Sequence, residues 1–218
     1  MSLHRWKKIS SHVDHDHRIF ALRRDVVISP RTGVEHEFLV LQSQDWVLIL
    51  AMTEDGEVVL VHQYRHGLGD FTVEMPGGLV DDRFNPEEAA RAELREETGF
   101  GAGTWTYLGR LAVVPAVFDN SLHVFLARGV RRISEVDLDE GEDILTELVS
   151  LEEVRARIAD GRLVHAPVVA AMYLYDQWMR VGSSPSTADP GPGRPGLGET
   201  GEAASAEGGE AAGDETGA

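Results

Sequence analysis

Residues 77–100, GGLVDDRFNPEEAARAELREETGF, predict a glycine turn, a short acidic loop and a helix with clear boundaries. Asn85 is a good N-cap, and Pro86 suits the first helical position because its missing N–H has no intrahelical partner there. Gly99 suits the C-cap, where the chain often turns left-handed. We therefore expect one helix over residues 86–98, delivered by the glycine turn in front of it.

Three glutamates of this helix, Glu93, Glu96 and Glu97, fall within one sector of the helical wheel. Arg91 and Arg95 fall on roughly the opposite side, so we expect the three carboxylates to have no partner on their own helix. The helix dipole disfavours anions in the last turns, so a compensating charge is expected from outside. A hard divalent cation, Mg²⁺ or Mn²⁺, suits such oxygen ligands, and a solvated acidic face is the alternative.

The spacing of this stretch resembles the Nudix box, a loop and helix signature of hydrolases that act on nucleoside diphosphates linked to another group. Gly78 is followed after five residues by Phe84, and after seven more by the run AELREETGF. The family usually has Glu where this chain has Phe84 and Arg where it has Ala92. All three helical glutamates of the box are present.

The resemblance implies roles for the residues of the box. The backbone carbonyl of Gly77 is expected to bind the metal together with Glu93 and Glu97. Glu96 is expected to add a ligand to a second metal ion or to help polarise the attacking water. Glycine at the turn lets the chain approach the ion closely.

The resemblance extends over about residues 18–180 and is closest to the ADP-ribose pyrophosphatase branch. Residues 74–78, EMPGG, match that branch's approach to the box, and Arg65 in the run QYR is expected to contact substrate phosphate. Pro115 stands fifteen residues beyond Phe100, where members that cleave ADP-ribose carry a proline. Trp46 and Phe118 are candidates for stacking on a nucleobase, with a place in the core as the alternative.

In this branch a glutamate on a late loop acts as the general base. The run EGEDI at residues 140–144 occupies that place, and Glu142 is the first candidate, with Glu140 next. A solvated acidic loop is the alternative for either residue. A base must come within about 3 Å of the water that it deprotonates, and sequence alone cannot place it there.

These features predict a metal-dependent enzyme that splits the diphosphate of a nucleoside diphosphate sugar, with ADP-ribose giving AMP and ribose 5-phosphate. A hydrolase that prefers another nucleotide sugar is one alternative. A noncatalytic Nudix-like regulator that binds nucleotide sugars is the other. Retention of the three helical glutamates argues against the regulator, since a binding module has little use for an uncompensated acid cluster.

Composition narrows the class of protein further. The chain has 218 residues, 42% of them apolar, which suffices for one substantial domain. It contains no cysteine, so disulfides and thiolate sites are excluded. The net charge of −17 argues against binding to nucleic acid or to anionic membranes. The charged amino terminus and the lack of a long apolar run predict a cytoplasmic protein.

We expect an α/β (α+β) architecture of the Nudix type, a mixed β-sheet sandwiched between helices, with a small antiparallel sheet in front. Residues 1–42 form the β-rich N-terminal part, which the resemblance links to a homodimer interface. Residues 43–181 form the Nudix domain, with a hairpin around Asp55 and Gly56 and late helices over 151–159 and 167–180. Residues 182–218, rich in Gly, Ala, Pro and Glu, predict a disordered acidic tail.

The histidine-rich segment 12–17 is interpreted as a hydrated polar loop rather than as a metal site, because nothing else in the sequence fixes its geometry.

Overall fold

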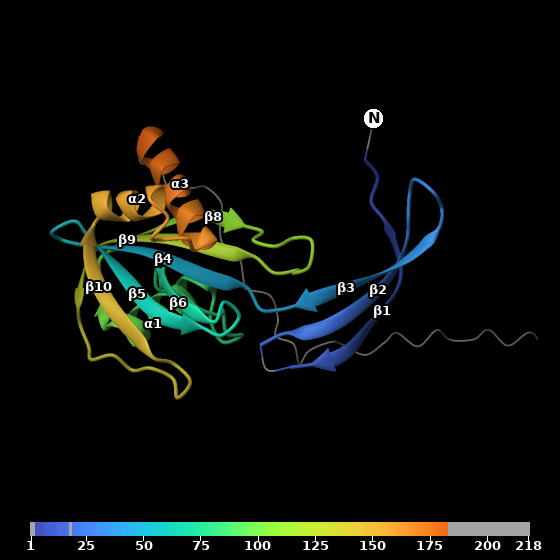
Figure 1. The fold of residues 1–218 in the computed structure, drawn as a ribbon, viewed down its shortest axis with the longest axis horizontal. Coiled ribbons are helices and arrows are strands. Elements are labelled where there is room, and N and C mark those ends of the chain that lie inside the picture. Colours follow the sequence, from blue (N-terminus) through green and yellow to red (C-terminus); the bar gives the residue numbers. More distant parts are fainter. Residues whose placement is uncertain (1–2, 18, 183–218) are drawn as a thin grey trace, which may run out of the picture.

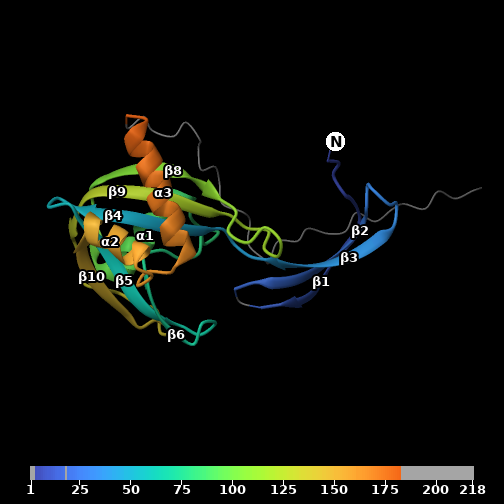
Figure 2. The ribbon, with the colours of Figure 1, turned by 45° about the horizontal axis from the view of Figure 1, so that its top comes forward.

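The computed structural model describes residues 3–17 and 19–182, which fold into two β-sheets and three helices. The smaller sheet is antiparallel and has the strand order β1-β2-β3, as predicted for the N-terminal part. It projects from the side of a larger α/β body (Figures 1 and 2). Its strands are β1 (Lys7–Asp16), β2 (Ala21–Ile28) and β3 (Glu35–Gln42).

The interpretation of residues 12–17 as a loop was wrong, because most of this segment belongs to β1. The strand pairs with β2 along its length, and Arg24 of β2 binds the carboxylate of Asp14 at 2.8 Å. Cross-strand pairing therefore holds a strand that has no apolar periodicity of its own. Among the described residues, no group of three or more His, Asp or Glu side chains is arranged to hold a metal ion.

The larger sheet has seven strands and is mixed, as expected. Strand β4 runs parallel to β9, and the other strand pairs are antiparallel. The main order is β10-β5-β4-β9-β7, with β6 on β5 and β8 on β9. The strands are β4 (Trp46–Thr53), β5 (Glu57–Arg65), β6 (Asp70–Glu74), β7 (Phe100–Gly101), β8 (Thr104–Leu111), β9 (Leu122–Arg132) and β10 (Ile144–Ser150).

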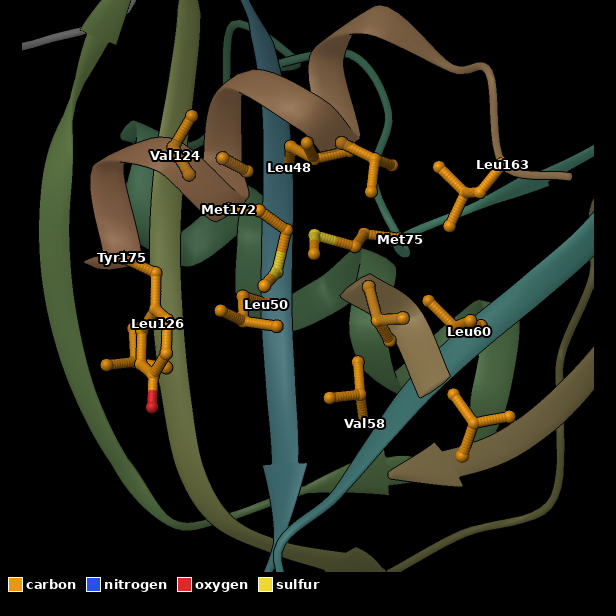
Figure 3. Packing of buried hydrophobic residues seen from close by; sticks show 14 of the residues in the cluster. Leu48, Leu50, Val58, Leu60, Met75, Val124, Leu126, Leu163, Met172 and Tyr175 are labelled. Atoms are coloured by element: carbon orange, nitrogen blue, oxygen red, sulfur yellow. The ribbon is translucent and has the colours of Figure 1, made fainter. Parts of the chain in front are cut away.

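Helices cover both faces of this sheet. Helix α1 (Pro86–Thr98) buries Ala90 and Leu94 against one face. Helices α2 (Leu151–Ala159) and α3 (Ala166–Arg180) cover the other face, where their apolar side chains meet alternate residues of the central strands (Figure 3). The sandwich of helix, sheet and helix predicted from the sequence is thus confirmed. None of the helices in residues 3–17 and 19–182 is both long and apolar enough to cross a membrane.

The boundaries of α1 agree with the prediction. The side chain of Asn85 accepts hydrogen bonds from the N–H groups of Glu87 and Glu88, each at 3.0 Å. The Glu88 side chain in turn accepts a hydrogen bond from the Asn85 N–H at 3.0 Å, which completes a capping box. Gly99 ends the helix with φ of 74°, a left-handed conformation that favours glycine.

The hairpin formed by β4 and β5 opens away from its turn. The two strands pair at Met52 and Val58, next to the turn, and then diverge. The segment that follows β6 fills the gap: the N–H groups of Val47 and Ile49 donate to the carbonyls of Gly78 and Pro76, each at 2.9 Å. The chain that leads into α1 is therefore wedged into the sheet beside β4.

Candidate functional site

The glycine turn lies against two different partners. A Cβ atom on Gly77 would stand 2.2 Å from the carbonyl oxygen of Val47 in β4. A Cβ atom on Gly78 would stand 2.3 Å from a carboxylate oxygen of Glu93 in α1. At Gly77 a side chain would meet backbone atoms and is excluded, whereas at Gly78 it would require the Glu93 carboxylate to move aside. The bare backbone can therefore sit between the sheet and the acidic face of the helix.

The peptide groups of the turn face these partners alternately. The carbonyls of Pro76 and Gly78 point to β4, whereas the N–H of Gly77 donates to Oε2 of Glu97 at 3.0 Å. In an extended segment, the N–H and C=O groups of one residue point to the same side. The carbonyl of Gly77 therefore faces the carboxylates of α1, which is the orientation that a metal-binding carbonyl needs.

Glu93 and Glu97 are carboxylates in a setting that disfavours negative charge. Burial, together with the charge of Glu93, raises the pKa of Glu97 to about 8, although the Gly77 N–H works in the opposite direction. Burial also raises the pKa of Glu93 to about 7, with the charges of Glu142 and Glu96 adding to the effect. A buried and a half-buried carboxylate thus converge with a carbonyl. Hard divalent cations prefer such oxygen donors.

Glu96 differs from Glu97 in its surroundings, and one expectation about it was wrong. Its Oε1 accepts a hydrogen bond from Arg95 at 2.6 Å, so one helical carboxylate does have a partner on its own helix. The side chains of Arg95 and Glu96 bend towards each other, although consecutive residues lie about 100° apart on the helical wheel. Glu96 is also 42% exposed, whereas Glu97 is 3% exposed, so the sector contains two different environments.

The two residues that depart from the box lie apart from the contact between Glu97 and the Gly77 turn. Phe84 is exposed in the loop before α1, and the guanidinium of Arg83 lies 5.5 Å from its ring centroid. Ala92 is half-buried on α1. The missing Glu and Arg therefore leave the contact between Glu97 and the Gly77 turn in place.

Arg65, the predicted phosphate ligand, is held by a buried acid that the sequence analysis did not identify. Its Nε and Nη2 atoms donate to the two carboxylate oxygens of Glu74 at 2.6 and 2.7 Å. Thr72 donates to Glu74 at 2.5 Å, and Nε2 of His165 lies 3.4 Å from the same carboxylate. Burial lowers the pKa of His165, and its Nδ1 atom is buried without a hydrogen bond.

The sequence carried only a weak signal for this network. Thr72 and Glu74 are two residues apart on β6, so both side chains lie on the same side of the strand. His165, however, comes from the start of α3 and meets them only through the fold. Side chains from distant segments, such as His165, cannot be joined to Arg65 by spacing alone.

A cavity of about 540 Å³ adjoins the glycine turn. Arg65, Trp46 and Phe118 all line it, so the fold brings these three predicted substrate residues together. Pro115 does not line it and is exposed in the loop before β9. The lining comprises Ile19, Phe20, Leu41, Ser43, Trp46, Val47, Leu48, Arg65, Glu74, Met75, Gly77, Gly78, Leu79, Phe118, Leu122, His165 and Pro167.

The two aromatic candidates form one wall of the cavity. The ring centroids of Trp46 and Phe118 lie 5.6 Å apart at an angle of 61°, and both side chains are half-buried. Trp46 also packs against the apolar core, so the two interpretations offered for it are compatible. A T-shaped aromatic pair at a cavity wall offers ring surface to a planar ligand.

The acidic loop 133–143 lies beside α1, where the Asp137 N–H donates to the carbonyl of Glu96 at 2.9 Å. Glu142 is exposed, and its charge raises the pKa of both Glu93 and Glu97. Its Oε2 accepts a hydrogen bond from the Asp139 N–H at 3.1 Å, which stabilises the tip of the loop. Glu142 thus stands near enough to Glu93 and Glu97 to act on them electrostatically.

The chain is similar to several known proteins. A family model described as the NUDIX domain matches residues 42–172. The ADP-ribose pyrophosphatase of Mycobacterium tuberculosis is 35% identical over 174 residues, which cover 79% of this chain and 84% of that protein. The ADP-ribose pyrophosphatase of Bacillus subtilis is 33% identical over 132 residues, which cover 60% of this chain and 71% of that protein.

Among solved structures, a crystal structure of an ADP compounds hydrolase matches with a TM-score of 0.73. The match covers 84% of this chain and all of that chain, at 24% identity. At this identity, the comparison supports the fold alone.

Proposed function

The chain belongs to the Nudix hydrolase family, and from this premise we propose that it hydrolyses the diphosphate of ADP-ribose to AMP and ribose 5-phosphate. Water adds its OH to one phosphorus while the bond from that phosphorus to the bridging oxygen breaks. The released phosphate takes the remaining proton. The relatives in M. tuberculosis and B. subtilis bear the name of this activity, which supports ADP-ribose as the first substrate to test.

The observation that carries the proposal is the pair of carboxylates beside the Gly77 turn, Glu97 buried and Glu93 half-buried, whose pKa values are both raised. Glu93 and Glu97, with the Gly77 carbonyl, would hold a divalent cation, with Mg²⁺ first and Mn²⁺ next. Such a cation would screen the charge of the diphosphate and lower the pKa of a bound water. Glu96 stands one turn from Glu93 and is proposed as a further ligand or as a residue that helps to polarise that water.

The other residues of the site bind substrate and move the proton. Arg65 directs a guanidinium into the same cavity, where its charge would hold a phosphate group, while Glu74 fixes its orientation. Trp46 and Phe118 would hold the nucleobase against the apolar wall. Pro115 is exposed, so its proposed part in substrate binding requires the substrate to extend beyond the cavity. We propose that Glu142 first accepts the proton of the attacking water and then passes it to the released phosphate.

Incubation of the protein with Mg²⁺ and ADP-ribose, followed by chromatography of the products, tests this function. The panel should include other nucleotide sugars, dinucleoside polyphosphates and NADH. Stoichiometric AMP and ribose 5-phosphate are expected. Faster turnover of another nucleotide sugar would show that the enzyme is a nucleotide-sugar hydrolase that prefers that substrate to ADP-ribose. Tight binding of ADP-ribose without turnover of any substrate would favour the noncatalytic regulator instead.

The assignment of the general base has its own test. E142Q should lower kcat about 100-fold or more while leaving the affinity for Mg²⁺ nearly unchanged, because it removes a proton acceptor and not a ligand. E140Q is the matched control, since it changes the same loop by the same chemistry. A normal rate for E142Q would place the base elsewhere, and a slow E140Q would exchange the two roles.

We also propose that the protein is a cytoplasmic homodimer that pairs through residues 1–42. The N-terminal sheet leaves large apolar side chains in solvent, among them Trp6, Phe38 and Leu39, which are about half exposed. Light scattering coupled to gel filtration should give twice the mass of the chain, and F38E should shift it towards the monomer. A monomeric wild type would end this part of the proposal, and cell fractionation tests the compartment.

A further inference from the structure

The apolar wall of the cavity is built partly by the N-terminal segment of the same chain. Ile19, Phe20 and Leu41 line it together with Trp46 and Phe118. Phe118 itself belongs to the loop between β8 and β9, which no helix covers in Figure 1. The position of its ring therefore depends on its contact with Trp46 and on what holds this loop.

The loop is bonded to the end of β3. The N–H of Leu41 donates to the carbonyl of Val117 at 2.9 Å, and the N–H of Asp119 donates to the carbonyl of Leu41 at 3.3 Å. Leu41 and Phe118 form a parallel β-bridge between these bonds. The N-terminal sheet thus continues, by backbone pairing, into the segment that carries Phe118.

Arg23 adds an ion pair at the same place. Its Nη1 atom lies 2.7 Å from Oδ2 of Asp119, and both side chains are more than four-fifths buried, at 17% and 18% exposure. Its Nε atom donates to Asp25 on the same strand at 3.1 Å, which fixes the guanidinium from the other side. Arg23 does not line the cavity, so any effect that it has on a ligand there is indirect.

We propose that Arg23 is a positioning residue for substrate binding. It holds Asp119, and Asp119 holds the neighbouring Phe118 ring at the wall that receives the nucleobase. The N-terminal sheet is then part of the binding site of its own subunit, whatever contacts it makes with a second copy. This inference rests on the proposed function, because it assumes that a nucleotide occupies the cavity.

Loss of the ion pair should weaken binding and leave the chemical step alone. The wall that Arg23 supports is separate from the residues that surround the diphosphate, Glu93, Glu97 and Arg65. R23Q should therefore raise KM for ADP-ribose about tenfold and change kcat by less than about twofold. The rise should be equal for ADP-ribose and ADP-glucose, because the two share the base. R23K, which keeps the charge, should restore most of the affinity.

The chain offers a matched control one residue away. Arg24 lies on the same strand and pairs with Asp14 and Glu37, within the N-terminal sheet. R24Q removes ion pairs of that sheet without touching the loop, so its KM should equal that of the wild type. D119N should reproduce R23Q, and the double variant should be no worse than either single one. If R23Q fails to fold, D119N carries the test.

Equal KM values for R23Q, D119N and R24Q would overturn the inference, as would a loss confined to kcat. A wild type that does not hydrolyse ADP-ribose is a failure of the proposed function, and titration with AMP then replaces kinetics. R23Q should bind AMP about tenfold more weakly than R24Q does. Equal affinities would overturn the role of Arg23, and no binding of AMP by the wild type would overturn both proposals.

Discussion

At the scale of single residues, the buried acid Glu97 illustrates the conflict between stability and function in this site. Its carboxylate is 3% exposed and keeps only one backbone hydrogen bond, from Gly77. Burial raises its pKa to about 8, so the folded chain resists its ionisation at neutral pH. The ionised carboxylate destabilises the metal-free protein, and a bound cation would stabilise it.

E97Q should therefore make the metal-free protein more stable and inactive. The amide oxygen can still accept the Gly77 hydrogen bond, while the buried negative charge is gone. We expect the free energy of unfolding at pH 8 to rise by about 1 to 3 kcal/mol, and turnover to fall about 100-fold or more. Thermal unfolding without Mg²⁺ and a product assay with Mg²⁺ measure the two effects.

E96Q provides the comparison for stability. Glu96 is half-exposed and paired with Arg95, so its replacement should leave the unfolding temperature within about 1 °C of the wild type. An unfolding temperature for E97Q below that of E96Q would contradict the view that Glu97 is destabilising. Near-normal turnover by E97Q would contradict its role as a metal ligand.

At the scale of elements, the segment between β6 and α1 is the unusual feature. A β-hairpin normally pairs along both strands, whereas β4 and β5 separate and admit Pro76 and Gly78 as partners of β4. Pairing of this segment with β4 fixes the position of the Gly77 peptide relative to α1. The carbonyl and the helical carboxylates therefore converge because a piece of extended chain is locked into the sheet.

Gly77→Ala tests this pairing. The new methyl group would stand 2.2 Å from the backbone oxygen of Val47, which no rotamer change can relieve. We expect a loss of about 1 to 3 kcal/mol in stability together with weaker Mg²⁺ binding, measured by urea unfolding and calorimetric titration. Gly67→Ala is the control, since open space surrounds that glycine. Equal stability of the two variants would show that β4 tolerates a wider gap.

At the scale of the whole molecule, each of the two sheets contains a carboxylate with a depressed pKa. Desolvation raises the pKa of Asp25 in the small sheet, but hydrogen bonds from Ser11, Lys8 and Arg23 outweigh it and lower the pKa to about 2. In the large sheet, hydrogen bonds from Arg157, opposed by desolvation and helped by His62, lower the pKa of Glu147 to about 2. Asp25 joins β1 to β2, and Glu147 joins β10 to β5 and α2, so each charge supports the packing of its own sheet.

The pH dependence of stability follows from these shifts. Both carboxyls bind a proton less readily in the folded chain than in the unfolded one, so their contribution is complete above about pH 5 and is lost as the pH falls towards 2. After allowance for solvent screening, we expect each to contribute about 1 to 2 kcal/mol. Unfolding temperatures from pH 6 to pH 2 should fall less steeply for D25N and E147Q than for the wild type. Parallel curves would refute this origin of the acid sensitivity.

The predicted acidic tail, residues 182–218, lies outside the described residues apart from Gly182. By sequence it contains seven acids and one arginine, which leaves −11 of the total charge of −17 for residues 1–182. The negative net charge of residues 1–182 repels a phosphate-bearing substrate, so local cations must attract it. The position of Arg65 at the cavity is consistent with this role.

Local chemistry explains what the sequence determined by itself. The ends of α1, the Asp55-Gly56 turn and the three helical glutamates depend on residues within a few positions of one another, so capping and periodicity rules predict them. The small antiparallel sheet and the mixed large sheet also followed from the pattern of short apolar runs. Strand β1 escaped prediction because its stability comes from a partner strand and not from its own composition.

The tertiary structure alone decided which of these residues meet. Arg65 and His165 are 100 positions apart in the chain, yet both contact Glu74, and Arg23 reaches Asp119 across 96 positions. The separation of Glu96 from Glu97 likewise depends on packing, which buries one carboxylate and leaves the other beside Arg95. Contacts between distant segments are set by how helices and strands pack, and packing depends on the shape of the whole core rather than on any local pattern.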